Sequence, residues 1–157
     1  MGGFLLSGHN RGMRRKPPPH SSPDELETAL YEALQTADLD RLMGCWADEE
    51  EIVCVHPGGA RLIGPAAIRE SFEALFANGR IACFPERIRR MDVGGCAVHS
   101  VLERVEVMSH DGARNAYVLA TNVYAKTAQG WRLLVHHASP GGPVEQPDTT
   151  ALPKTLH

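Results

Sequence analysis

The sequence predicts an α+β domain in which three helices cover one face of a strongly curved antiparallel sheet around a central pocket. In the first half of the chain, apolar residues recur at helical spacing. In the second half, apolar stretches of strand length are separated by Gly-containing breaks. A histidine, His56, ends a short apolar stretch between these regions and is followed by Pro and Gly. Helices that precede a run of strands are typical of the α+β class.

The first helix is predicted to begin at Ser22-Pro23-Asp24-Glu25. Ser is a favoured N-cap, Pro is favoured at the first helical position, and Glu25 stands where a capping box needs it. Leu26, Leu30, Ala33 and Leu34 then recur at helical spacing and predict the buried face. A helix that starts here should pack on the core through these side chains.

Two further helices are predicted on similar grounds. Asp38-Leu39-Asp40 opens a short one, and Gly64-Pro65 opens a longer one that Asn78-Gly79 ends. In the longer helix the spacing i, i+4, i+7, i+8 predicts a buried stripe of Ile68, Phe72, Leu75 and Phe76. Between these two helices, residues 52–56 predict the first strand.

Four longer strands are expected in the rest of the domain, near residues 83–91, 97–108, 115–126 and 131–139. The breaks between them, Gly94-Gly95, Asp111-Gly112 and Gln129-Gly130, are hairpin signals. The last strands should therefore form an antiparallel meander. Alternation along the last strand predicts that His136 and His137 face opposite ways, with His137 on the side of Leu133.

The folded domain is predicted to span residues 22–142, between tails at 1–21 and 143–157 that are expected to be disordered. The net charge is −3, and because the only charged residues before Asp24 are four basic ones, the remainder carries −7 (−3 minus +4). An acidic domain argues against nucleic acid as the main partner, because phosphate binding needs clustered Lys and Arg.

Cysteine spacing and hydropathy indicate a cytoplasmic protein. The four cysteines form no Cys-x-x-Cys and are interpreted as small core residues in a reducing compartment. No apolar run approaches the ~20 residues of a membrane span, so no membrane association is expected. None of the eight histidines has metal-ligand spacing, and no phosphate-binding glycine loop is present, so neither a metal nor another cofactor is expected.

Three polar residues are candidates for chemistry. His56 is a candidate base, or else a histidine that satisfies a turn amide beside Pro57. Asn122 lies in a strand where an inward amide needs a partner, so it lines a polar cavity or bonds a neighbouring strand. Glu103 shares its strand face with apolar residues and is a pocket acid or half of an interface ion pair.

Several local motifs occur in an order that resembles a known superfamily. They are Ala37-Asp38-Leu39-Asp40, Trp46-Ala47-Asp48, Val55-His56-Pro57-Gly58-Gly59, Gly64-Pro65-Ala66-Ala67-Ile68, and the ending Gly130-Trp131-Arg132 to His136-His137-Ala138-Ser139. Over residues 24–140 the chain resembles the nuclear-transport-factor-2-like superfamily, in its SnoaL-like and ketosteroid-isomerase-like branch. The resemblance implies a cone-shaped fold with a central pocket and a sheet-face homodimer.

The resemblance also implies roles for particular residues. The isomerases place an Asp base in an Asp-Pro-x-Gly run, and the matching position here is His56. Their protonated Asp, which holds the oxyanion, matches Asn122, counted back eight residues from Gly130. Their helix Tyr aligns with Leu30, and Tyr31 is expected to point about 100° away from it.

Two functions follow for this chain as expectations. In the first, His56 and Asn122 act on an apolar carbonyl compound in an isomerase, cyclase or dehydratase reaction. The predicted substrate-binding residues are Trp46, Phe72, Phe76, Glu103 and Tyr124. In the second, the domain is a non-catalytic ligand-binding or dimerisation module of the same fold.

Overall fold

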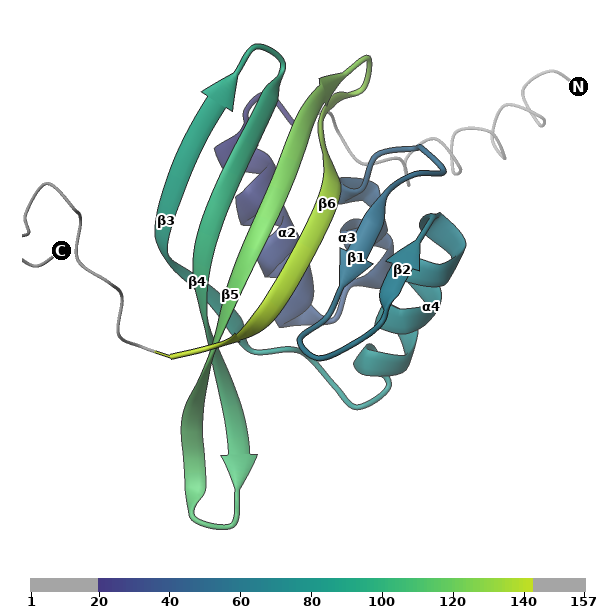
Figure 1. Cartoon of the computed structure of the whole chain (residues 1–157). Coiled ribbons are helices and arrows are strands. Elements are labelled where there is room, and N and C mark those ends of the chain that lie inside the picture. Colours follow the sequence, from purple (N-terminus) through teal and green to yellow (C-terminus); the bar gives the residue numbers. More distant parts are fainter. Residues whose placement is uncertain (1–19, 143–157) are drawn as a thin grey trace, which may run out of the picture.

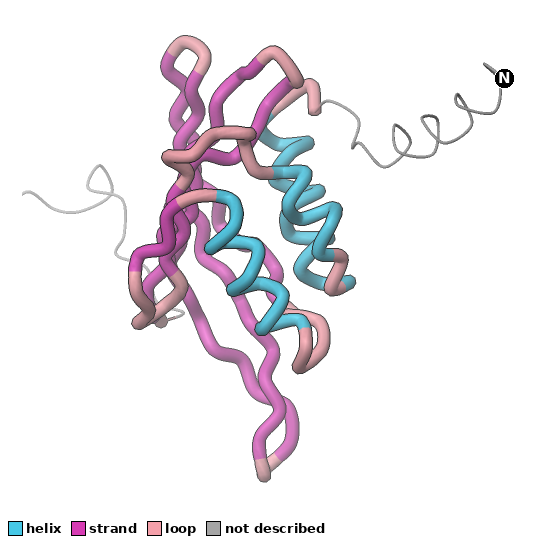
Figure 2. Tube along the Cα trace, turned by 90° about the vertical axis from the view of Figure 1, so that its right-hand side faces the viewer, coloured by secondary structure: helices cyan, strands magenta, loops and turns pink. Residues whose placement is uncertain are grey.

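The computed structural model describes residues 20–142, and within them it confirms the predicted fold class. The helices are α2 (Pro23–Thr36), α3 (Leu39–Cys45) and α4 (Pro65–Phe76), and the strands are β1 (Val53–Val55), β2 (Arg61–Ile63), β3 (Cys83–Val93), β4 (Cys96–Ser109), β5 (Gly112–Thr127) and β6 (Gly130–Gly141). The strands form one curved sheet in the order β2-β1-β6-β5-β4-β3 (Figure 1). The helices lie on one side of it (Figure 2). The predicted tails, apart from His20 and Ser21, lie outside the described residues.

The start of α2 follows the sequence signals, with one shift. The Ser22 hydroxyl accepts a hydrogen bond from the Glu25 amide at 3.1 Å, as an N-cap does. The Glu25 carboxylate reaches Ser21, accepting from its amide and hydroxyl, instead of returning to Ser22. The helix then ends at Ala37, which adopts a left-handed conformation with φ 53°. The contacts with Glu25 attach Ser21, which the sequence analysis assigned to the tail, to the first turn of α2.

The other helices confirm the predicted starts and refine the buried faces. Asp38 caps α3 by accepting from the Arg41 amide at 3.1 Å, and Gly64 precedes Pro65 at the start of α4. In α4, Ile68 and Phe72 are buried, whereas Leu75 is 39% exposed. The predicted stripe is therefore buried in its first half only. The short strand β2, which the sequence analysis missed, pairs with β1 just before α4.

The sheet contains the predicted antiparallel meander of β3 to β6, and one parallel pairing, between β1 and β6. A β-bulge interrupts β6. Val123 pairs with Val135, but Tyr124 pairs with Leu133, which leaves one extra residue in β6 at Leu134. Beyond a bulge the alternation of faces shifts by one residue.

This bulge corrects the predicted orientation of the two histidines in β6. His136 lies on the inner face together with Leu133, and His137 is exposed. The alternation argument failed because it counted Leu134 as a regular strand residue. Within residues 20–142, no helix is long and apolar enough to cross a membrane.

Candidate functional site

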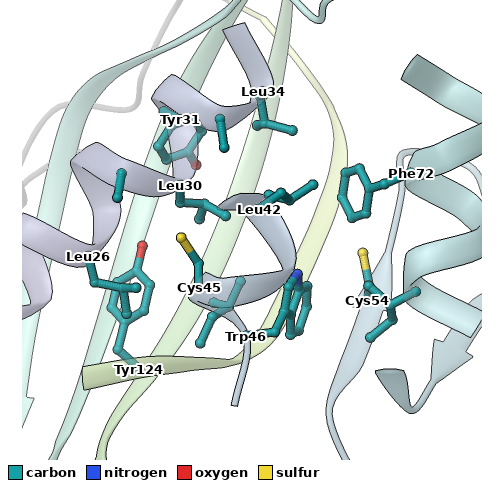
Figure 3. Close-up of a cluster of buried hydrophobic side chains, with 14 of the residues drawn as sticks. Leu26, Leu30, Tyr31, Leu34, Leu42, Cys45, Trp46, Cys54, Phe72 and Tyr124 are labelled. Atoms are coloured by element: carbon teal, nitrogen blue, oxygen red, sulfur yellow. The ribbon is translucent and has the colours of Figure 1, made fainter. Parts of the chain in front are cut away.

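A cavity of about 470 Å³ lies between the helices and the inner face of the sheet. Its lining is mostly apolar and includes Leu30, Leu34, Trp46, Phe72, Leu75, Ile81, Val105, Val118 and Leu133. Figure 3 shows several of these side chains converging from α2, α3 and α4. Five titratable side chains also line it: Tyr31, His56, Cys83, Glu103 and His136. An apolar cavity with a few convergent polar groups is typical of a small-molecule site.

His56 lies just after β1, on the cavity wall, where its ring packs edge-on against Phe72 with centroids 5.0 Å apart. Its Nε2 is 3.0 Å from the Ser71 hydroxyl oxygen, and that hydroxyl donates to the Ile68 carbonyl, also at 3.0 Å. Because Ser71 has only one hydroxyl proton, Nε2 must be the donor, so Nδ1 carries the lone pair. Burial lowers the pKa of His56, which favours the neutral imidazole.

Asn122 is fully buried on β5 and is not among the residues that line the cavity. Its Nδ2 donates to the Tyr31 hydroxyl at 3.0 Å, and its Oδ1 is 2.6 Å from His136 Nδ1. Both ends of the amide therefore bind the protein itself. Of the two alternatives for Asn122, the structure shows the second: the amide does not line the cavity and instead bonds His136 on the neighbouring strand β6.

Tyr31 lies in the cavity, which corrects the expectation that it points away. The buried face of α2 is wide and includes both Leu30 and Tyr31, so a 100° step does not take Tyr31 out of it. The Tyr31 hydroxyl donates to Glu103 Oε2 at 2.6 Å. Burial raises the pKa of Glu103, and burial together with the nearby Glu103 raises the pKa of Tyr31.

These hydrogen bonds determine which nitrogen of His136 is protonated. The Tyr31 proton goes to Glu103, so its oxygen accepts from Asn122 Nδ2, and Asn122 Oδ1 must then accept from His136 Nδ1. The lone pair of the neutral ring is therefore on Nε2. Burial, and then the neighbouring His56 and His137, lower the pKa of His136 to about 4. His136 is a second neutral base in the cavity.

Of the predicted substrate-binding residues, Trp46, Phe72 and Glu103 line the cavity, and Phe76 and Tyr124 do not. Phe76 is partly buried against the core, with its ring centroid 6.1 Å from that of Phe72. Tyr124 is fully buried, and its hydroxyl donates to Glu27 at 2.6 Å.

A second buried network, centred on Glu27, lies beside the cavity. Glu27 Oε2 accepts from the Tyr124 hydroxyl and is 2.9 Å from His99 Nδ1. His99 pairs across the sheet with Asn122, so the two networks occupy adjacent strands. Sequence analysis missed Glu27, because a glutamate in an amphipathic helix normally faces solvent.

Within residues 20–142, only one group of three His, Cys, Asp or Glu side chains has its possible ligand atoms close enough together to hold a metal ion, and it includes two members of the Glu27 network. Carboxylate oxygens of Asp24 and Glu27 and a ring nitrogen of His99 lie within 4.8 Å of one another. Arg90 Nε already binds Asp24 at 2.8 Å and supplies the positive charge there. We therefore assign no metal to this cluster.

Replacing Asn122 by aspartate is expected to raise the pKa of His136 well above its value of about 4. A carboxylate next to Nδ1 favours the imidazolium, which the neutral amide does not. The measurement is an NMR titration of the His136 ring protons. The control is Asn115→Asp, an exposed asparagine on the same strand. An unchanged His136 titration in Asn122→Asp would contradict the hydrogen bond between the two side chains.

Comparison with known proteins assigns the chain to a family. The SnoaL-like domain family matches residues 24–143, so the chain belongs to that family. A candidate calcium/calmodulin-dependent protein kinase type II association domain from Thiobacillus denitrificans is 32% identical, with a TM-score of 0.73 over 80% of this chain and 100% of that chain. A candidate dehydratase of the NTF2-like family from Streptomyces avermitilis is 30% identical, with a TM-score of 0.67 over 74% and 91%.

A third solved structure, the S. rosetta CaMKII hub, is 21% identical, with a TM-score of 0.62 over 78% of this chain and 99% of that chain. At that identity it shows the shared fold alone. No curated protein matches the chain. The comparisons therefore establish an NTF2-like fold of the SnoaL-like branch, which hosts both enzymes and assembly domains.

Proposed function

We propose that the chain binds a small apolar carbonyl compound in its cavity and removes a proton from the carbon beside the carbonyl group. His56 is the general base. The observation that carries the proposal is His56 on the wall of an apolar cavity, with its pKa lowered by burial and the lone pair on Nδ1. A positioned base of this kind contributes roughly 10²- to 10⁴-fold to the rate.

The cavity also holds an acid, and this favours elimination of water. His56 takes the proton from the carbon beside the carbonyl group, and the electron pair of that bond gives an enolate. When the carbonyl group re-forms, the double bond to the next carbon forms and the hydroxyl group on that carbon leaves as water with a proton from Glu103. Burial raises the pKa of Glu103 and so favours the carboxylic acid that this step needs. The relative from Streptomyces avermitilis, a candidate dehydratase, is consistent with this reaction.

The experiment that tests proton abstraction does not require the natural substrate. The protein is incubated with 2-decalone, an apolar bicyclic ketone, in D₂O, and deuterium uptake at the carbons beside the carbonyl is measured by mass spectrometry. We expect uptake above that of buffer containing an equal concentration of imidazole. Uptake equal to this control would contradict the proposal.

The rate of this exchange should depend on pH in a defined direction. His56 must be neutral to accept a proton, and burial places its pKa below the ordinary value of about 6.5. The rate should therefore stay constant between about pH 8 and 7 and fall only below about pH 6.5. A rate that falls already between pH 8 and 7 would contradict a neutral, buried base.

A second proposal is assembly through the outer face of the sheet. One apolar residue from each strand lines up in register across that face: Ile63, Val53, Val135, Val123, Val98 and Met91. The ends of this row are open to solvent, with Ile63 54% and Met91 62% exposed. Exposed apolar rows of this kind mark interfaces. The relative from Thiobacillus denitrificans, a candidate association domain, is consistent with assembly, and a homodimer is the simplest assembly through this face.

Val123→Asp, at the centre of this row, should therefore convert a homodimer to a monomer in sedimentation velocity. A charge buried in an interface without a partner is strongly unfavourable. The control is Ala66→Asp, which adds the same charge at an exposed position on α4. A dimer that survives Val123→Asp unchanged would exclude this face as the interface.

A further inference from the structure

The indole N–H of Trp46 is a buried donor with no hydrogen-bond partner among residues 20–142. Trp46 follows the last residue of α3, is only 4% exposed, and lines the cavity. Figure 3 shows the indole nitrogen on the edge of the ring nearer to Leu42 and Phe72. Buried N–H groups are nearly always paired in folded proteins, so an unpaired one at a cavity wall calls for an acceptor.

Two donors at or behind the cavity wall already have acceptors in the protein. The Tyr31 hydroxyl donates to Glu103, and the Asn122 amide donates to Tyr31 behind the wall. Asn122, the residue expected to hold the oxyanion, is fully buried and is not a lining residue, so it presents no N–H to a ligand. Among the described residues that line the cavity, Trp46 is the one whose buried nitrogen donor has no partner in the protein.

The acceptors and charges of the cavity restrict the ligand further. His56 Nδ1 and His136 Nε2 carry lone pairs, and no described residue donates to either. A ligand hydroxyl group would supply such a donor. No Lys or Arg occurs among the described residues that line the cavity. A carboxylate or phosphate would enter this cavity without a positive partner, which is unfavourable.

We infer that the ligand is a neutral hydroxy-carbonyl compound with an apolar skeleton and that its carbonyl oxygen accepts the Trp46 indole N–H. Neighbouring side chains cover the nitrogen, so the ligand reaches it when one of them changes rotamer. The inference about the ligand rests on the cavity alone. The catalytic part rests on the proposed function: as His56 takes the proton from carbon, the electron pair moves to the carbonyl oxygen, and Trp46 stabilises the resulting negative charge.

The first test is an NMR spectrum of the indole N–H groups with ¹⁵N-labelled protein. The chain has two tryptophans, so two signals are expected, and Trp46→Phe assigns them. On addition of a hydroxydecalone, the Trp46 signal should move downfield and its N–H should exchange more slowly with solvent. The Trp131 signal is the internal control, because Trp131 is not a lining residue. A Trp46 signal that does not move, or that moves no more than the Trp131 signal, overturns the inference.

The second test compares affinities. Trp46→Phe keeps an aromatic ring and removes the N–H, and it should weaken hydroxydecalone binding roughly two- to tenfold, the range of one hydrogen bond. Trp131→Phe should leave binding unchanged. Decalin-2-carboxylate, with the same skeleton and a charge, should bind more weakly than the hydroxydecalone to the unmodified protein. Equal binding of the charged and neutral compounds overturns the assignment of a neutral ligand.

These readouts separate the inference from the proposed function. If the Trp46 signal moves as expected but no deuterium exchange occurs, the ligand class stands and the catalytic proposal fails. If exchange occurs while the Trp46 signal does not move, His56 is a base but Trp46 is not the donor. The first test measures the unmodified protein, and Trp131→Phe assigns the same two signals, so the test remains possible even if Trp46→Phe does not fold.

Discussion

Replacing His56 by glutamine is expected to lower the rate of deuterium exchange into 2-decalone by about 10²- to 10⁴-fold, the usual contribution of a general base. The glutamine amide can still donate to the Ser71 hydroxyl. The variant therefore keeps an N–H···O hydrogen bond between this side chain and α4. It cannot accept a proton near neutral pH. The loss should therefore appear in the rate, with the thermal unfolding midpoint little changed.

The matched control for this substitution is His137→Gln. His137 is exposed on β6, next to the cavity histidine His136, so the same change there should leave the exchange rate unchanged. An exchange rate in His56→Gln equal to that of the unmodified protein would refute His56 as the base. If His136→Gln alone abolished exchange, the role of base would pass to His136, whose lone pair is also free.

Most of the fold could be predicted because its signals are local. An N-cap such as Ser22 or Asp38 acts within one turn of helix, and a hairpin such as Asp111-Gly112 is specified by the residues at its tip. Such signals are readable without knowledge of any partner. The short strand β2 was missed because its three residues are defined by pairing with β1 and carry little pattern of their own.

The candidate site was predicted less well, because its geometry depends on contacts between distant segments. The position of His56 followed from the strand end before Pro57. By contrast, His136 enters the cavity only because of the bulge at Leu134, and a bulge is a property of two paired strands. The role of Asn122 also depended on its partners, since an amide can serve a ligand or its neighbours equally well.

The burial of Glu27 also depends on contacts with distant segments and could not be predicted from the sequence. Its replacement is expected to cause the largest change in stability. Its carboxylate is buried with His99 and Tyr124 as its partners, and the side chains of Glu27 and His99 are only 4% and 1% exposed. Replacing Glu27 by alanine would leave the His99 ring and the Tyr124 hydroxyl buried without their acceptor. Removal of one member of a buried pair typically costs about 3 to 5 kcal/mol. We expect a loss of this size in the free energy of unfolding.

Glu32→Ala is the matched control, because Glu32 lies on the same helix and also binds a basic side chain. Its carboxylate accepts from Arg41 at 2.7 Å, but the two side chains are 51% and 40% exposed. An exposed pair of this kind contributes only about 0 to 1 kcal/mol. Urea unfolding of both variants measures the difference directly. Equal losses in Glu27→Ala and Glu32→Ala would contradict the expected contribution of the buried carboxylate, because water or a rearrangement of His99 and Tyr124 would then replace it.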